Sequence, residues 1–198
     1  MILAVDTSLG TAVAVIDADG RTVAEAAAPD PLGHAEVIGD LLAQVAQPGI
    51  THVVAGMGPG PFTGLRIGIA AARAFALGRG IPVIPVPSHH AIAQMLLDDG
   101  TTGPFAVVTD ARRREIAVSV FDGADADGIP NLLIPTRLEK QGTALERPAH
   151  EAVELHAAAL ARVGARVIAA NRTLTGAEPL YLRSPDVVQP GRPKRVSS

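Results

Sequence analysis

The chain has 198 residues, a formal net charge of −3 and no cysteine, and 47% of its residues are hydrophobic but only 3% aromatic. Such a chain can form one large or two small lobes with a core of Ala, Val, Leu and Ile. The weak negative charge argues against a general attraction to nucleic acid or acidic membranes. The lack of cysteine excludes disulfides, thiolate metal sites and a thiol nucleophile.

The first hundred residues alternate between strand and helix patterns. Apolar runs predict strands at 2–6, 11–17, 22–28, 52–57 and 82–87. Apolar residues at helical spacing, among them Leu41 and Val45, predict a helix over 35–47. Further helices are predicted at 64–77 and 89–97.

The second half is shorter and begins after a polar, Gly- and Pro-bearing stretch at 98–104. Strands are predicted at 105–109 and 116–121, and a helix at 149–163. After Leu182 the chain is rich in proline and basic residues, which is typical of disorder. We therefore expect an N-terminal lobe at 1–100, a smaller C-terminal lobe at 101–184 and a disordered tail at 185–198.

The two halves share a weak internal repeat. Residues 4–17 and 108–122 both read as a strand ending in Asp, a polar turn, a second apolar strand and another Asp. A duplicated β-hairpin at the start of each lobe leaves such a pattern. The repeat predicts an α/β, two-lobe actin-like (ASKHA, ribonuclease H-like) fold with mixed sheets and a reduced second lobe.

The segment 58–68, between the predicted strand at 52–57 and the helix that follows, is the most informative part of the chain. Its glycines and prolines predict a stiff turn, and Thr63 occupies a position suited to a helix N-cap. Arg66 then falls in the first helical turn, where the helix dipole disfavours a cation. The residues that define this signature loop are Gly58, Pro59, Gly60, Phe62, Thr63 and Arg66.

One side of the helix after this loop carries almost no side chain. It is lined by Gly64, Gly68, Ala71, Ala72 and Phe75. Small residues allow another backbone to approach closely. We expect this side, together with Leu41 and Val45 of the preceding helix, to contact a partner. The alternative is that it packs within its own lobe.

The turn after the first strand is a candidate phosphate site. Asp6, Thr7 and Ser8 have the side chains that cradle an anion in such turns, although an Asp at a strand end also caps its own turn. No glycine pair follows Gly103 to hold adenosine, and 58–68 lacks the lysine of a P-loop. We therefore expect no self-contained ATPase and, at most, a vestigial phosphate site.

No histidine pair has the i, i+4 spacing that places two imidazoles on one helix face, so no metal site and no catalytic residue is predicted. No run reaches the ~18 apolar residues of a membrane helix, and Met1–Asp6 lacks the basic region of a signal peptide. These features predict a cytoplasmic location.

Four segments resemble the TsaB (YeaZ) family. GPGPFTGLRIG at 58–68 is similar to the family's GPGSFTGLRIG signature, with Pro61 where serine is usual. The turn 110–115 resembles its DAR-x-x-E turn, and 181–183 resembles its C-terminal YLR. Residues 2–8 look like its N-terminal strand and turn.

This resemblance implies a role in making threonylcarbamoyladenosine (t6A) in tRNA. The chain would be a non-catalytic scaffold that activates a TsaD-like transferase, would meet tRNA only within the complex, and would be no enzyme by itself. A TsaE-like ATPase would join the assembly, with ATP and metal bound on the partner subunits and no cofactor on this chain alone. Without its partner the chain would form a homodimer.

Two other functions remain open at this point. The hairpins that carry Asp6 and Asp110 would suit a stand-alone actin-like ATP-dependent kinase. A glycoprotease-like metallohydrolase is the other alternative, and the histidine spacing argues against it.

Overall fold

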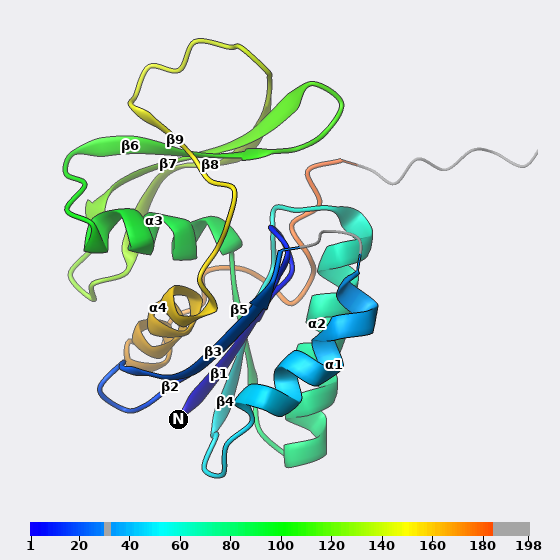
Figure 1. The fold of residues 1–198 in the computed structure, drawn as a ribbon. Coiled ribbons are helices and arrows are strands. Elements are labelled where there is room, and N and C mark those ends of the chain that lie inside the picture. The colour runs from blue at the N-terminus through cyan, green and yellow to red at the C-terminus, as the bar shows by residue number, and fades with distance from the viewer. Residues whose placement is uncertain (30–32, 184–198) are drawn as a thin grey trace, which may run out of the picture.

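Sheets and helices alternate in layers through the molecule (Figure 1). The structure is a computed structural model that describes residues 1–29 and 33–183, so the tail predicted at 185–198 lies outside the described residues. Two helices cover one side of the first sheet, two others lie between the first and second sheets, and the second sheet forms the far side.

The first sheet is mixed and has the strand order β3-β2-β1-β4-β5. Its strands are β1 (Ile2–Asp6), β2 (Thr11–Ile16), β3 (Thr22–Ala28), β4 (His52–Gly56) and β5 (Val83–Val86). The first three pair antiparallel, whereas β4 runs parallel to both β1 and β5. The parallel pairs require crossover connections, and helices supply them.

Alternation along β1 divides the core into two layers. Leu3 and Val5 face the cluster formed with α1 (His34–Val45) and α2 (Phe62–Arg79). Ala4 faces the opposite cluster, which contains residues of α3 (Ser88–Asp98) and α4 (Ala157–Ala169). Because side chains of a strand alternate between faces, one short apolar strand serves both layers.

The second sheet, also mixed, has the order β8-β7-β6-β9. Its strands are β6 (Pro104–Asp110), β7 (Glu115–Ala124), β8 (Pro130–Lys140) and β9 (Ala149–Glu151). Phe105, Val107 and Phe121 point into the same core as α3 and α4, so one continuous apolar layer joins the two sheets.

The helix α4 corrects the prediction of a helix at 149–163. The residues at the start of that range form β9, and the helix begins only at Ala157. Although α4 lies in the part of the sequence expected to form the second lobe, it packs against β1 and β2 of the first sheet.

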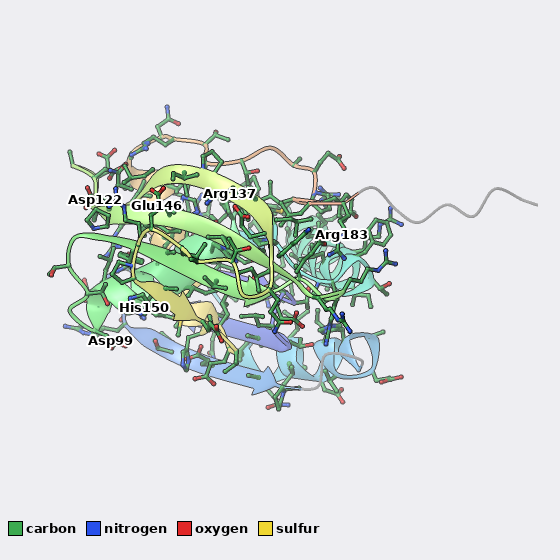
Figure 2. The ribbon with its side chains drawn as sticks, turned by 90° about the horizontal axis from the view of Figure 1, so that it is seen from above. Asp99, Asp122, Arg137, Glu146, His150 and Arg183 are labelled. Carbon is green, nitrogen blue, oxygen red and sulfur yellow. The ribbon has the colours of Figure 1, made fainter. Side chains whose placement is uncertain are left out.

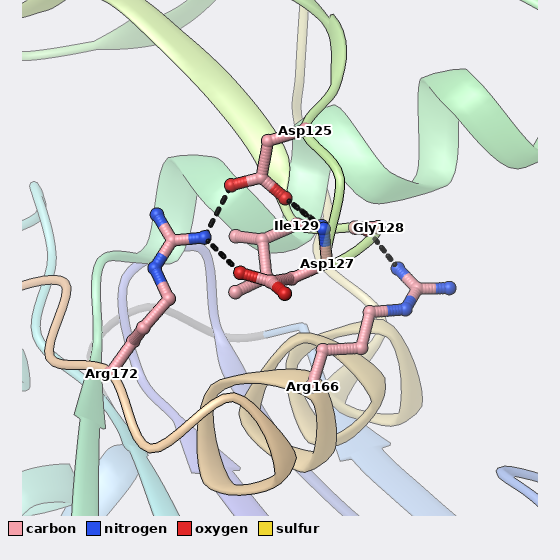
Figure 3. Close-up of polar contacts among 6 residues, drawn as sticks. All are labelled: Asp125, Asp127, Gly128, Ile129, Arg166 and Arg172. Atoms are coloured by element: carbon pink, nitrogen blue, oxygen red, sulfur yellow. Dashed lines mark hydrogen bonds and ion pairs between the residues drawn. The ribbon is translucent and has the colours of Figure 1, made fainter.

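Arginines of α4 and of the segment after it hold the turn between β7 and β8 (Figure 3). Arg166 donates to the carbonyl of Gly128 at 2.9 Å. Arg172 forms ion pairs with Asp125 and with Asp127, the latter at 2.8 Å. The second sheet is thus tied at this turn to a helix that packs on the first.

The predicted fold class is confirmed: the chain is α/β, with two mixed sheets in the actin-like arrangement. Most predicted elements of the first hundred residues lie within two residues of the observed bounds. The prediction missed β8 and β9. Among the described residues, no helix has both the length and the apolar character needed to span a membrane.

Candidate functional site between the two lobes

The signature loop is anchored by a serine at the start of α3. The Ser88 backbone N–H donates to the carbonyl of Gly58 at 2.8 Å, and the Gly58 N–H donates to Ser88 Oγ at 3.0 Å. Ser88 Oγ in turn donates to Asp6 Oδ2 at 2.5 Å. The loop is therefore fixed to the end of β1 through a residue that the sequence did not single out.

The turn of Asp6, Thr7 and Ser8 is buried, with exposures of 1%, 1% and 4%, and its polar groups bond within the chain. Asp6 Oδ1 accepts from the Ser8 N–H at 2.7 Å and from Ser8 Oγ at 2.5 Å. Thr7 Oγ1 donates to the carbonyl of Gly64 at 2.8 Å. The geometry contradicts the prediction of a vestigial phosphate site, because these side chains are buried and their polar groups already bond within the chain.

Burial raises the pKa of Asp6 above its ordinary value, and the hydrogen bonds from Ser8 and Ser88 oppose that rise. A carboxylate loses hydration in the interior, which favours its neutral form. The hydroxyls restore part of the lost solvation. Asp6 therefore acts as a structural hub that joins β1, the signature loop and α3.

The bare side of α2 faces the chain itself. A Cβ on Gly64 would lie 2.8 Å from His34 Nε2, and one on Gly68 would lie within 3.0 Å of the Thr7 side chain. Ala72 is fully buried. The expectation that these three residues meet a partner is wrong, because β1 and α1 already occupy that side.

Two residues of α1 correct the predicted interface in the same way. Leu41 and Val45 are 7% and 1% exposed and belong to the core beneath the first sheet.

The start of α2 also differs from the prediction. The helix begins at Phe62 with Pro61 at the N-cap, so Thr63 lies inside the first turn and caps nothing.

The outward side of α2 is apolar and small. Ala70 and Ala74 are exposed, Ile67 is partly exposed, and Leu77 is 84% exposed. These positions are spaced i, i+3, i+7 and i+10, which places them on one side of the helix. Ala71 and Phe75 lie at its margin and are partly buried against the core. We call the residues Ile67, Ala70, Ala74 and Leu77 the α2 outer stripe.

The last described residues, 177–183, form a strap across the signature segment. The Leu180 N–H donates to the carbonyl of Met57 at 2.8 Å. The rings of Tyr181 and Phe62 lie 4.6 Å apart between centroids. Arg66 donates from Nε to Tyr181 Oη at 2.9 Å, and its guanidinium lies 3.9 Å from the Phe62 ring centroid. These contacts explain a cation in the first turn of α2, which bonds to aromatic groups.

The strap also reaches the second sheet. Arg183 pairs with Glu115 of the turn 110–115, and it donates to the Arg112 carbonyl at 3.2 Å. Figure 2 shows Arg183 where the end of the described chain meets the sheet, on the opposite side of the view from Asp122 and His150. The strap thus joins the two segments that the sequence singled out in different lobes.

A pocket of about 490 Å³ lies where these segments meet. Its wall contains Pro59 to Phe62 of the signature loop, 109–113 of the β6–β7 turn, Ala117 and Leu138 of the second sheet, and 180–183 of the strap. The three motifs were recognisable in the sequence. Their convergence on one pocket, and the contributions of Leu138 and Leu180, were not.

The central histidines are buried and neutral. Burial, with a smaller effect of the adjacent His90, lowers the pKa of His89 to about 3. Burial alone lowers the pKa of His90 to about 4. His89 bonds to Ser119 Oγ at 2.7 Å and to Thr109 Oγ1 at 3.0 Å, so it links α3 to the second sheet. Within residues 1–29 and 33–183, no three His, Asp or Glu side chains gather as metal ligands would.

Comparison with known proteins identifies the relatives of this arrangement. A family model described as TsaD, tRNA N6-adenosine threonylcarbamoyltransferase, matches residues 34–177. The chain belongs to this family. Within it, the resemblance to TsaB (YeaZ) proteins is confirmed in sequence by a curated TsaB relative.

The individual relatives differ in how much they cover. The chain is 40% identical over 156 residues to "Uncharacterized protein ML0378" of Mycobacterium leprae, a match covering 73% of this chain and 42% of that protein. It is 38% identical over 64 residues to the "tRNA threonylcarbamoyladenosine biosynthesis protein TsaB" of Haemophilus influenzae, covering 32% of this chain and 27% of that protein. The chain therefore spans less than half the length of either relative.

Its fold closely matches a solved structure from Pseudomonas aeruginosa, a protein described as similar to the peptidase YEAZ. The TM-score is 0.75 at 24% identity, covering 92% of this chain and 99% of that chain. At this identity the likeness establishes the fold alone.

Proposed function

We propose that this chain takes part in t6A biosynthesis as a non-catalytic scaffold that pairs with a TsaD-like transferase subunit. Membership of the TsaD family and the likeness to the Haemophilus TsaB protein support the pathway. The transfer itself would take place on the partner. ATP and metal would be bound by partner subunits, and tRNA would be met only in the complex.

The observation that carries this proposal is the α2 outer stripe. It presents small side chains and the 84% exposed Leu77 along one side of an 18-residue helix. Small residues let a second helix approach closely, and a large exposed apolar side chain gains most from being covered. This stripe replaces the buried Gly64 and Gly68 as the proposed partner surface.

The side chains that a kinase or a metallohydrolase of this fold would use are buried and bonded within the chain. A kinase of this fold would present the hydroxyls of the first turn to phosphate, yet Thr7 and Ser8 are buried and bonded within the chain. A metallohydrolase would present imidazoles to a metal, yet His89 has hydroxyls on both ring nitrogens. These contacts favour a scaffold over the kinase and the metallohydrolase.

The same proposal extends to the other partners. A TsaE-like ATPase would join the pair. A TsaD-like partner would present a homologous helix to the stripe, so without the transferase the stripe would meet a second copy of the chain in a homodimer. The site of action would be the cytoplasm, where tRNA is modified.

Depletion of the protein, followed by mass spectrometry of tRNA nucleosides, tests the pathway. We expect t6A to fall, and complementation with Ala74→Arg or Leu77→Arg should fail because each places a charge in the partner contact. Leu133→Arg is the matched control, since Leu133 is also exposed but lies on β8. Unchanged t6A after depletion would exclude the pathway. Full rescue by both α2 variants would place the interface elsewhere.

The scaffold role needs a separate measurement. The purified chain, supplied with threonylcarbamoyl-adenylate and unmodified tRNA, should form no t6A until the TsaD-like subunit is added. Product from the chain alone would overturn the non-catalytic assignment.

A further inference from the structure

The pocket between the lobes has the dimensions of a small-molecule site. Its volume of about 490 Å³ falls within the range of ligand pockets, which occur preferentially where domains meet. Four separated segments of the chain build it. The signature loop, the β6–β7 turn, the second sheet and the strap border an open pocket, which a ligand in contact with both lobes could enter.

One part of its wall is apolar and held in place by the strap. Pro59 and Pro61 are rigid, and Phe62 packs on Tyr181 at 4.6 Å between ring centroids. Leu138 and Leu180 add aliphatic surface. The apolar wall suits the hydrophobic body of a ligand, since covering it removes apolar area from water.

The other part of the wall is cationic. Arg112, Arg113 and Arg183 line the pocket, and the acid among its lining residues is Asp110. Arg112 and Asp110 approach to 3.5 Å, and both remain more than half exposed. Arg183 is paired with Glu115, so the guanidinium that a ligand would meet is that of Arg112.

The backbone holds these arginines at a conformational cost. Arg112, Arg113 and Arg114 have φ values of 63°, 56° and 61°, in the left-handed region that side chains disfavour by roughly 1–2 kcal/mol per residue. Strain of this kind persists where the surrounding structure imposes it, often at ligand sites. Here it places guanidinium groups at the edge of an apolar pocket.

We propose that this pocket binds a small organic anion, a carboxylate or phosphate carried on an apolar body. The body lies against Phe62, Leu138 and Leu180, and the anionic group meets Arg112 at the β6–β7 turn. Guanidinium groups bind carboxylate and phosphate through paired N–H donors. This binding does not depend on the role in t6A formation, because it uses neither the α2 outer stripe nor a partner subunit.

The test uses 8-anilinonaphthalene-1-sulfonate, which joins a flat apolar body to one anionic group, with the full chain. We expect one saturable site by fluorescence titration. Arg112→Gln should weaken binding at least tenfold, and Ala111→Phe should abolish it by filling the pocket. Asp110→Asn should tighten binding, because it removes the pocket's acid while retaining an oxygen that accepts the Arg112 N–H. Arg79→Gln, far from the pocket, should change nothing.

Competition identifies the anionic group. Phenyl phosphate and 4-phenylbutyrate present phosphate and carboxylate on similar bodies, and displacement by either supports the proposal. If neither displaces the probe, or if Arg112→Gln and Asp110→Asn both bind it as tightly as the wild type, the proposal is wrong. Circular dichroism confirms that each variant is folded. The two charge variants decide the question if Ala111→Phe does not fold.

Discussion

Replacing Gly68 by alanine should destabilise the protein even though alanine is the better helix former. In an exposed helix, Gly→Ala gains up to about 1 kcal/mol. At Gly68 the new methyl would lie 2.8 Å from Thr7 Cγ2 and closer still to Thr7 Oγ1, which donates to the Gly64 carbonyl. Overpacking of this kind costs roughly 1–3 kcal/mol. We therefore expect a net loss of about 1–2 kcal/mol.

Gly78 provides a matched control on the same helix. A Cβ there meets nothing within 4 Å, so Gly78→Ala should gain about 0.5–1 kcal/mol. Urea unfolding followed by circular dichroism measures both changes. In a double-mutant cycle, Thr7→Ala should make Gly68→Ala less costly, because it removes the atoms that the methyl strikes.

Two outcomes would refute this reasoning. If Gly68→Ala stabilises the protein as much as Gly78→Ala does, α2 does not pack on Thr7 as described. If the effects of Gly68→Ala and Thr7→Ala simply add, the destabilisation has another source. Either result would reopen the inner side of α2 as a partner surface.

Three further predictions concern buried groups. The pKa of Asp6 is raised in the folded state, so its contribution to the free energy of unfolding is favourable below pH ~3.8 and is lost as pH rises through the folded pKa. In urea titrations, the stability of the wild type relative to Asp6→Asn should therefore fall with rising pH. The opposite trend would mean that the pKa is lowered. His89 has a folded pKa of about 3, so its contribution to the free energy of unfolding is present above pH ~6.5 and is lost on acidification, by about 2 kcal/mol at pH 5. His89→Gln should therefore reduce the fall in stability that the wild type shows between pH 7 and pH 5. Gly164→Ala should lower the thermal midpoint, because its methyl would lie 3.0 Å from Val54 Cγ1, and Val54→Ala should restore part of the loss; an unchanged midpoint would exclude close packing of α4 on β4.

Local patterns predicted most of the first sheet and its helices. The strands there are apolar, short and bounded by turn residues, so the hydrophobic pattern and the turn residues predict the same bounds. β8 was missed because it is an edge strand whose leucines, Leu132 and Leu133, are partly exposed on successive positions and show no alternation. The Ala-rich run at 149–163 has helical composition, but pairing of Ala149–Glu151 with β6 overrides it at the start.

The candidate site was predicted in its parts and not in its assembly. The signature loop, the turn 110–115 and the YLR segment all stand out in the sequence. Which of them touch depends on contacts between residues 115 apart, such as Arg66 with Tyr181. The prediction that the bare side of α2 meets a partner was wrong for the same reason. Small residues indicate that another backbone approaches closely, but only the fold reveals that the neighbour is Thr7.

The position of α4 has a consequence for how the protein is made. One side of the first sheet, including Ala14, Ile16 and Val54, is covered by a helix that is not synthesised until residue 169. While the ribosome adds the intervening residues, that apolar side stays open to water and to other chains. Long-range closure of this kind slows folding and exposes intermediates to aggregation. We therefore expect a chain released early, at residue 150, to depend on chaperones and to precipitate, whereas one ending at residue 183 should remain dispersed.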